Sequence, residues 1–177
     1  MANMLRLASP LQYDSIVDGP GVRMVVWTQG CTHHCQDCHN PQTWDMQGGA
    51  EYAVDDLVQA IQEAQLQTGI TFSGGEPFLQ AEKLIPLAKA AKEKGYDLWA
   101  FSGFLWEDLV KEPIKKELLS YLDVLVDGRF QAELKDYRLV FKGSSNQRIL
   151  DVQSSFKAGK PIVSKYDDKN IALAEQK

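Results

Sequence analysis

The sequence has few cysteines and no long apolar run, and each shortage excludes a class of protein. Three cysteines occur among 177 residues: Cys31, Cys35 and Cys38. An odd, tightly grouped set does not form the disulfide framework that stabilises small secreted domains. No stretch approaches the ~20 apolar residues of a membrane span, and residues 1–10 lack the apolar segment of a secretion signal. We therefore expect a cytoplasmic protein with no membrane partner.

Positive charge is also in short supply. The chain has 19 Lys and Arg residues against 24 Asp and Glu residues, a net charge of −5, which argues against binding to nucleic acid. Apolar content is 44% and charged content 24%, both ordinary for a globular protein. The length predicts a single domain over 1–177. Its core is expected at about 13–152, and the polar segment at about 164–177 is expected to be a flexible tail or a frayed helix.

Apolar periodicity predicts that strands and helices alternate along the chain. Strands are expected at 22–28, 70–73, 97–101, 123–126, 137–141 and 148–152, and helices at about 53–67, 77–94 and 107–121. Pro86 should kink or split the second helix, and Pro113 should break the third. Trp99 and Trp106 are expected to pack in the core. This order predicts an α/β fold with a mainly parallel sheet.

The cysteines form a short loop with the spacing Cys31-x3-Cys35-x2-Cys38. Three thiolates in one loop fill three corners of an iron–sulfur cube and leave one iron without a protein ligand. A catalytic metal needs such an open position. Ligand chemistry alone leaves two alternatives open, which are a zinc site completed by a nearby histidine and a group of unligated thiols. The candidate zinc ligands are His33, His34 and His39; the first two are expected to face solvent.

A glycine pair follows the predicted strand 70–73, in the run Ser73-Gly74-Gly75-Glu76. Glycine permits positive φ and a close approach of the backbone to a ligand, and Glu76 offers a carboxylate to a cation. Taken alone, a simple strand-to-helix turn explains these residues better. Sites in parallel α/β folds collect at the carboxyl ends of strands. The cysteine loop and the glycine pair both follow strands, so we expect them at one edge of the sheet.

The cysteine spacing, followed by the glycine pair after the next strand, resembles the radical S-adenosylmethionine superfamily. The resemblance implies a partial, open TIM-like barrel that holds a [4Fe–4S] cluster and S-adenosylmethionine. It implies that Cys31, Cys35 and Cys38 are the cluster ligands and the catalytic residues. The cofactor-binding residues that it implies are Ser73, Gly74, Gly75 and Glu76 at the methionine end, and the backbone at Asp37, Cys38 and His39 near the adenine. Asp37 departs from the family, many of whose members carry an aromatic residue there.

Further segments are similar to activating enzymes of glycyl-radical enzymes. These are 18–23 (DGPGVR) and 27–31 (WTQGC), and two more, 123–130 (DVLVDGRF) and 143–148 (GSSNQR), look like the activating proteins of anaerobic ribonucleoside-triphosphate reductases. Without the resemblance, 143–148 would be a polar hairpin loop. The resemblance covers about 13–152 and implies Asp18 and Arg23 at the opening that admits the partner's glycine loop.

The function implied by this resemblance is that of an activase, an oxidoreductase. It would generate a 5′-deoxyadenosyl radical and install a glycyl radical on the large catalytic subunit of the anaerobic reductase. A low-potential donor such as flavodoxin would supply the electron. Two alternatives stay open: an activase of another glycyl-radical enzyme such as pyruvate formate-lyase, and a non-catalytic metal-binding module that docks a partner.

Overall fold

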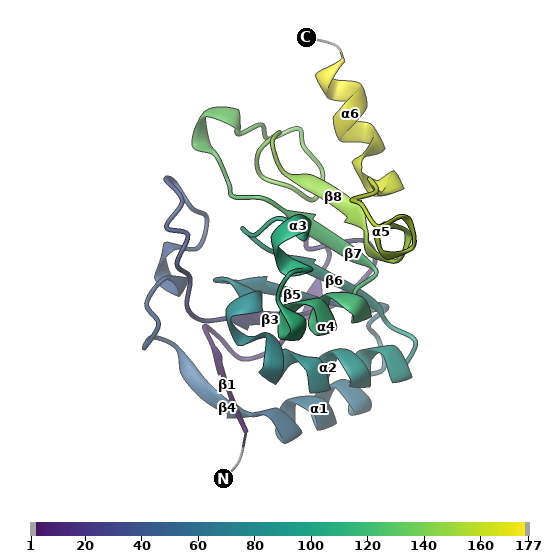
Figure 1. Ribbon diagram of the computed structural model, residues 1–177. Helices are drawn as coiled ribbons and strands as arrows, with labels where there is room; N and C mark the ends of the chain where they lie inside the picture. The colour runs from purple at the N-terminus through teal and green to yellow at the C-terminus, as the bar shows by residue number, and fades with distance from the viewer. Residues whose placement is uncertain (1–2, 176–177) are drawn as a thin grey trace.

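The computed structural model describes residues 3–175, which form one mixed β-sheet with helices packed along it (Figure 1). The strands are β1 (Met4–Leu7), β2 (Gln12–Ser15), β3 (Arg23–Thr28), β4 (Ala50–Ala53), β5 (Gly69–Gly74), β6 (Asp97–Phe101), β7 (Val124–Asp127) and β8 (Arg148–Asp151). The α-helices are α1 (Val54–Glu63), α2 (Ala81–Glu93), α3 (Trp106–Leu109), α4 (Pro113–Tyr121), α5 (Val152–Ala158) and α6 (Asp168–Ala174). Short 3-10 turns are η1 (Pro41–Thr43), η2 (Pro77–Gln80), η3 (Ala132–Leu134) and η4 (Lys165–Asp167).

The centre of the sheet is parallel and its margins are antiparallel. The strand order is β4-β1-β3-β5-β6-β7-β8, with β2 also paired to β3. Strands β3, β5, β6 and β7 run parallel to one another, whereas β1, β2, β4 and β8 pair antiparallel to their neighbours. Within residues 3–175, β4 and β8 do not pair with each other, so the sheet stays open. The expected α/β class with a parallel centre is confirmed, and closure into a barrel is not seen.

Side chains alternate between the two faces of the sheet, as the period of a β-strand requires. One face packs against α1, α2 and α4 and buries residues such as Met24, Phe72 and Leu98. The opposite face carries a smaller cluster formed by Trp99, Val124, Val126 and Ile149. Both Trp99 and Trp106 are buried, as expected. None of the helices in the described part of the chain has the length and apolar character to cross a bilayer.

Most central elements lie where periodicity predicts them, but the strand expected at 137–141 is wrong. Phe141 has a φ of +58°, which a strand does not accommodate. The Asn170 side chain accepts a hydrogen bond from Val140 N and donates one to Val140 O. The backbone groups that a neighbouring strand would use are therefore taken by a side chain from α6. That helix occupies half of the segment 164–177, where a flexible tail or frayed helix was expected; residues 176–177 lie outside the described range.

The two helix-breaking expectations had different outcomes. Pro113 is the first residue of α4, so the break before it is confirmed. Pro86 does not split α2, which runs unbroken from Ala81 to Glu93. A proline in a helix removes the hydrogen bond to the carbonyl four residues earlier, which here belongs to the exposed Glu82. That carbonyl can be hydrated, while the buried neighbours Ile85 and Leu87 hold the helix on the sheet.

Arg23 lies at the amino ends of the parallel strands. Its side chain is fully buried. It donates to Thr71 Oγ1, to the backbone oxygens of Pro20, Ile70 and Asp97, and to Asp97 Oδ2, at 2.8–3.0 Å. The expectation that Arg23 lines the opening for a partner's glycine loop is therefore wrong. Its guanidinium joins the first residues of β3, β5 and β6 and holds the 18–21 loop against them.

We predict that Arg23→Lys destabilises the protein although it conserves the charge. An ammonium cannot reproduce the planar fork of donors, so several buried acceptors lose a partner and the free energy of unfolding should fall by about 2–4 kcal/mol. Urea denaturation measures this change. The control Arg138→Lys alters an arginine whose side chain is 58% exposed and should leave the urea midpoint unchanged. Equal midpoints for the two variants would contradict the anchoring role of Arg23.

Candidate functional site

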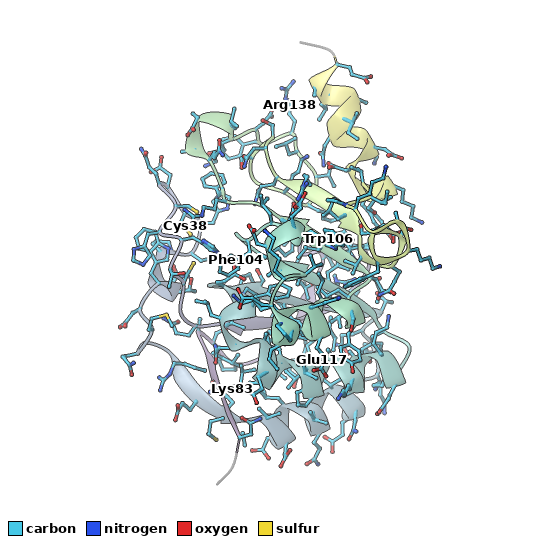
Figure 2. All side chains as sticks on the ribbon, viewed as in Figure 1. Cys38, Lys83, Phe104, Trp106, Glu117 and Arg138 are labelled. Atoms are coloured by element: carbon cyan, nitrogen blue, oxygen red, sulfur yellow. The ribbon has the colours of Figure 1, made fainter. Side chains whose placement is uncertain are left out.

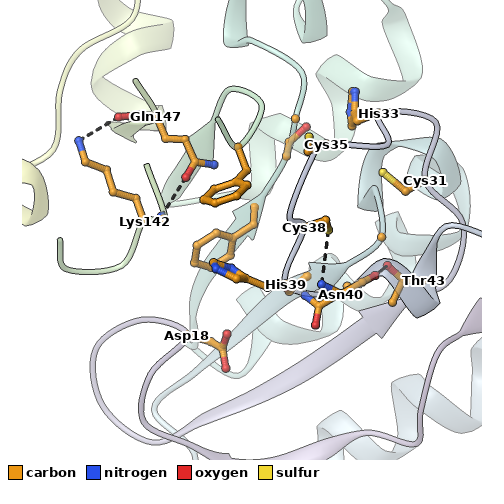
Figure 3. Close-up of a pocket in the computed structure, with 18 of the residues that line it drawn as sticks. Asp18, Cys31, His33, Cys35, Cys38, His39, Asn40, Thr43, Lys142 and Gln147 are labelled. Carbon is orange, nitrogen blue, oxygen red and sulfur yellow. Dashed lines mark hydrogen bonds between the residues drawn. The ribbon is translucent and has the colours of Figure 1, made fainter. Parts of the chain in front are cut away.

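A cavity of about 460 Å³ lies where β3, β5, β6 and β7 end (Figure 3). Figure 2 shows Cys38 on the long loop at one side of the molecule, away from Lys83 and Glu117 on the helices. Five stretches contribute most of the wall: the cysteine loop, the glycine turn at the end of β5, the end of β6, the loop around Gly128 and the loop around Gly143. The cysteine loop and the glycine pair thus meet at one edge of the sheet, as expected.

All three cysteines line this cavity. Their thiols are free; Cys31 is buried, and Cys35 and Cys38 are half-buried. The loop leaves β3 through Gly30, whose φ is +99°, and its start is held by backbone bonds from Gly30 N to Thr43 O at 2.8 Å and from Cys31 N to Trp44 O at 3.2 Å. These contacts fold residues 30–44 back on themselves, which brings the three thiols to the same wall (Figure 3).

Backbone amides approach the sulfur atoms of the loop. Asn40 N donates to Cys38 Sγ at 3.4 Å. Burial raises the pKa of the Cys31 thiol, while hydrogen bonding from the His33 backbone partly opposes the rise. Burial also raises the pKa of Cys35, opposed in part by hydrogen bonding from the Phe130 backbone. Amide hydrogen bonds to sulfur are a standard means of tuning cysteine-ligated iron–sulfur clusters, so the donor set matches that chemistry.

Two of the three histidines considered as zinc ligands are already engaged by other side chains. The His33 ring already pairs through Nε2 with Glu76 at 2.8 Å, and the His34 ring stacks on Trp44 with centroids 4.7 Å apart. Among the described residues, no three His, Cys, Asp or Glu side chains converge to hold a single ion. A [4Fe–4S] cube binds its cysteines at separate irons, so its ligands need not converge on one point.

The glycine turn is shaped by its contact with β3. Gly75 N donates to Thr28 O and Glu76 N donates to Gly30 O, both at 2.8 Å. Gly74 has a φ of +102°, and a Cβ there would lie 2.4 Å from Thr28 O. A Cβ on Gly75 would lie 2.3 Å from Gly30 O. The two glycines therefore allow the backbone of the turn to lie close to the backbone of β3 and Gly30. From that position Ser73, Gly74 and Gly75 line the cavity, where a ligand could also approach them closely.

Glu76 is placed differently from the rest of its motif. It is fully buried and is not part of the cavity wall. Its carboxylate accepts hydrogen bonds from Ser102 Oγ, Gly103 N and Phe78 N and contacts His33 Nε2. The expectation that His33 faces solvent is wrong, because its side chain is 5% exposed. The His34 residue is exposed, as expected.

Only two of the three residues expected near an adenine line the cavity. Cys38 and His39 line the cavity, and Asp37 does not. Asp37 is exposed and has a φ of +55°. The His39 ring lies against Phe130 with centroids 5.0 Å apart, and a Cβ on Gly143 would come within 3.2 Å of the same ring. Residues 38–39 thus face the far wall of the cavity. Asp18 lines the cavity too, and its place at an opening for a partner's glycine loop stays a prediction.

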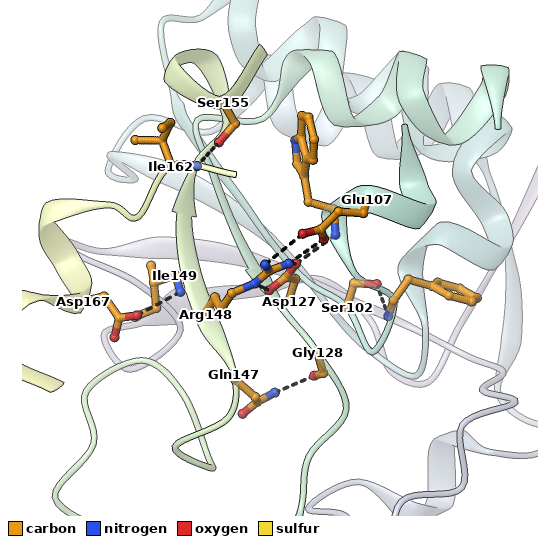
Figure 4. Close-up of polar contacts among 12 residues, drawn as sticks. Ser102, Glu107, Asp127, Gly128, Gln147, Arg148, Ile149, Ser155, Ile162 and Asp167 are labelled. Carbon is orange, nitrogen blue, oxygen red and sulfur yellow. Dashed lines mark hydrogen bonds and ion pairs between the residues drawn. The ribbon is translucent and has the colours of Figure 1, made fainter. Parts of the chain in front are cut away.

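The far wall is built from two segments that Gln147 joins. Gln147 Oε1 accepts from Gly143 N at 2.9 Å and from Ser144 N at 3.2 Å, and its Nε2 donates to Gly128 O at 3.0 Å (Figures 3 and 4). Residues 143–148 are therefore not only a polar loop, because the hydrogen bonds of Gln147 make them part of the cavity wall. Both Gln147 and Gly128 line the cavity.

Charged residues next to Gln147 hold the ends of β7, β8 and α3 together (Figure 4). Arg148 binds Asp127 and the carboxylate of Glu107, with both Glu107 contacts at 2.8–3.0 Å. Asp127 Oδ2 also accepts from Trp106 N at 2.8 Å. The hydrogen bond from Arg148 lowers the pKa of Glu107. These residues position the wall without lining the cavity.

Sequence reasoning missed most of the aromatic lining. The aromatic side chains on the wall are Trp27, Trp44, Phe101, Phe130 and Phe141. Trp27 and Phe101 stand at the carboxyl ends of β3 and β6, so strand position was the signal that could have identified them. Trp44, Phe130 and Phe141 lie on loops, and only the folded chain brings them to the cavity.

A family model described as a 4Fe-4S single cluster domain matches residues 17–150. Three relatives carry the name anaerobic ribonucleoside-triphosphate reductase-activating protein. The relative from Pasteurella multocida (strain Pm70) is 32% identical over 142 residues, which is 76% of this chain and 90% of the relative. The Haemophilus influenzae relative is 32% identical over 78% of this chain and 95% of its own length. The relative from Enterobacteria phage T4 is 33% identical over 78% of this chain and 93% of its own length.

A solved structure also aligns with part of the chain. It is the crystal structure of QueE from Escherichia coli, with a TM-score of 0.39 and 17% sequence identity over 58% of this chain and 51% of that chain. Similarity at this level supports no inference about fold or function.

We predict that Gln147→Leu loosens the far wall of the cavity. The leucine fills a similar volume but leaves Gly143 N, Ser144 N and Gly128 O without their partner, so amide exchange of residues 142–147 should become at least ~10-fold faster. Hydrogen exchange followed by mass spectrometry measures the change. As a control, Gln153→Leu removes hydrogen bonds from α5 to the carbonyls of Ser120 and Leu122 and should leave residues 142–147 unaffected. Unchanged exchange in Gln147→Leu would refute the role of this side chain.

Proposed function

This chain belongs to the family of anaerobic ribonucleoside-triphosphate reductase-activating proteins, and on that premise we propose that Cys31, Cys35 and Cys38 hold its [4Fe–4S] cluster beside bound S-adenosylmethionine. The chain is an activase with a single-cluster 4Fe–4S domain. The observation that carries the assignment of these residues is that the three thiols and the glycine pair of β5 line one cavity.

The residues present fit the two cofactors. Thiolates are the usual ligands of iron–sulfur clusters, and three of them leave one iron for another ligand. A cavity of about 460 Å³ is of the size that binds small molecules. Two polar atoms of cavity-lining side chains, His33 Nδ1 and Trp44 Nε1, are buried without a partner among the described residues. With both groups bound and one electron delivered to the cluster, they would supply a 5′-deoxyadenosyl radical able to take a hydrogen atom from a glycine of the reductase.

The chain's own residues position the reactants and exclude water. We propose that Ser73, Gly74 and Gly75 receive the methionine end of S-adenosylmethionine, and that Cys38 and His39 lie near its adenine. Neither Asp37 nor Glu76 lines the cavity, so Glu76 acts through the contacts that hold the turn, and Asp37 acts through the backbone that leads into Cys38. The aromatic side chains on the wall restrict water around a radical, because a closed apolar site suppresses side reactions.

The proposed partner is the large catalytic subunit of an anaerobic ribonucleoside-triphosphate reductase. We propose that its glycine loop enters from the side where the sheet stays open, past Asp18. The names of the relatives support this choice over pyruvate formate-lyase. The electron would come from a low-potential donor such as flavodoxin. Residues 1–177 would act as one domain with an open, partial barrel, in the cytoplasm, where thiols stay reduced.

We predict that Cys35→Ala abolishes activation because it removes one of three cluster ligands. After anaerobic reconstitution with iron and sulfide, the unaltered chain should bind about four irons. With dithionite, S-adenosylmethionine and the reductase, it should form 5′-deoxyadenosine and a glycyl doublet in the EPR spectrum. Cys35→Ala should bind less iron and form neither product.

The matched control is Gln36→Ala, which alters the exposed neighbour of Cys35 on the same loop and should behave as the unaltered chain. Unchanged 5′-deoxyadenosine formation by Cys35→Ala would overturn the cluster assignment. Zinc in place of iron, without cleavage of S-adenosylmethionine, would favour a non-catalytic module. A glycyl doublet on pyruvate formate-lyase but not on the reductase would reassign the partner.

A further inference from the structure

A buried contact joins the cysteine loop to the glycine turn. His33 Nε2 lies 2.8 Å from Glu76 Oε2, and the two side chains are 5% and 0% exposed. His33 stands between Cys31 and Cys35 on the loop (Figure 3), and Glu76 ends the Ser73–Glu76 run. Because the Glu76 carboxylate already accepts from Phe78 N, Ser102 Oγ and Gly103 N, we assign the N–H of this contact to His33 Nε2.

Glu76 is held in place by the body of the protein. Ser102 Oγ lies 2.9 and 3.0 Å from its two carboxylate oxygens, Gly103 N donates at 2.8 Å and Phe78 N at 3.1 Å. A buried carboxylate needs such donors to offset its lost hydration. Ser102 and Gly103 directly follow β6 and Phe78 belongs to η2, so Glu76 is a rigid point to which the cysteine loop attaches through His33.

The His33 ring packs closely against Gly103 and Phe104. A Cβ on Gly103 would lie 2.4 Å from His33 Cδ2, so the ring rests where any larger residue would displace it. The Phe104 ring meets His33 edge-on with centroids 4.7 Å apart. Glycine at 103 and the flat imidazole therefore fit each other, and the hydrogen bond to Glu76 sets the orientation of the ring.

The cysteine loop has few other attachments between its first and last cysteine. Within residues 32–37, no side chain other than His33 donates a hydrogen bond to the rest of the described chain. The His34 ring stacks on Trp44, which belongs to the same folded-back segment. Backbone bonds of Gly30 and Cys31 hold the start of the loop, and the His33–Glu76 contact is the side-chain attachment that ties the residues between Cys31 and Cys35 to the glycine turn.

We propose that His33 and Glu76 are positioning residues that hold the cysteine loop in its cluster-binding arrangement before any cluster is present. This inference rests on the proposed function, and it assigns Glu76 a role through His33 instead of a direct contact with the cofactor. Positioning of metal ligands by groups behind them commonly changes metal affinity 10–100-fold. The contact should therefore control how well the loop acquires and retains iron.

The test compares three substitutions of His33 in the full chain. His33→Phe keeps an aromatic ring against Gly103 but lacks the Nε2 donor. His33→Ala removes both the ring and the donor, and His33→Gln places an amide donor near the position of Nε2. In metal-free protein, the rate of Cys31 alkylation by iodoacetamide, read by mass spectrometry, should rise at least ~10-fold in the Phe and Ala variants. It should return toward the original rate in the Gln variant. Thr32→Ala, at the exposed neighbouring position, should not change it.

A second measurement follows the reconstituted protein. Iron loss to a chelator should be ~10–100-fold faster in His33→Phe than in the unaltered chain or Thr32→Ala, and the EPR spectrum of the reduced protein should change. Circular dichroism confirms that each variant is folded. Should His33→Phe fail to fold, Gly103→Ala displaces the His33 ring by steric contact while leaving the loop's own sequence unchanged, and it should raise Cys31 alkylation in the same way.

The outcomes separate this inference from the proposed function. A folded His33→Phe with the original alkylation rate and iron retention would overturn the positioning role while leaving the cluster assignment intact. Conversely, a chain that binds no iron–sulfur cluster would overturn the proposed function, and the alkylation rates in metal-free protein would still decide whether His33 holds the loop.

Discussion

The site depends on the close approach of two backbone segments at the carboxyl ends of β3 and β5. Gly75 N bonds to Thr28 O and Glu76 N to Gly30 O, a spacing that leaves no room for a Cβ on Gly74 or Gly75. Because Gly30 directly precedes Cys31, this approach determines where the cysteine loop leaves the sheet. It also puts the glycine turn opposite the thiols. A larger residue at either glycine would separate the two halves of the cavity.

Buried charged residues anchor the loops around the cavity, whereas residues of other kinds form much of the cavity surface. Arg23, Glu76 and Asp127 are fully buried, and each has several hydrogen-bond partners. A buried ion is tolerated only when it is paired in this way, which makes such groups effective anchors for loops. Thiols, glycines and aromatic rings then supply much of the cavity wall, a surface suited to a soft metal cluster and to exclusion of water.

The central elements followed from local patterns. Strands β3, β5, β6 and β7 and helices α1 and α2 have the apolar periods that fix which face is buried. Strands β1, β2 and β4 have four residues each, none of them buried along its whole length, whereas all four residues of β7 are buried, so only β7 shows a clear apolar run. The strand expected at 137–141 failed because Asn170, 30 residues away, binds the backbone of Val140. Pro86 does not split α2, because its buried neighbours hold the helix on the sheet.

The sequence by itself determined the three-cysteine loop, the glycine pair and their order after successive strands, since spacing along a chain and the steric freedom of glycine are local properties. The tertiary structure decided which residues of those motifs reach the cavity. It places Arg23 at the amino ends of the parallel strands and Glu76 outside the cavity wall, and it adds Gln147 and several aromatic side chains to that wall. His33 and Glu76 are 43 residues apart, and their contact exists only because parallel pairing of β3, β5 and β6 aligns the ends from which their loops begin.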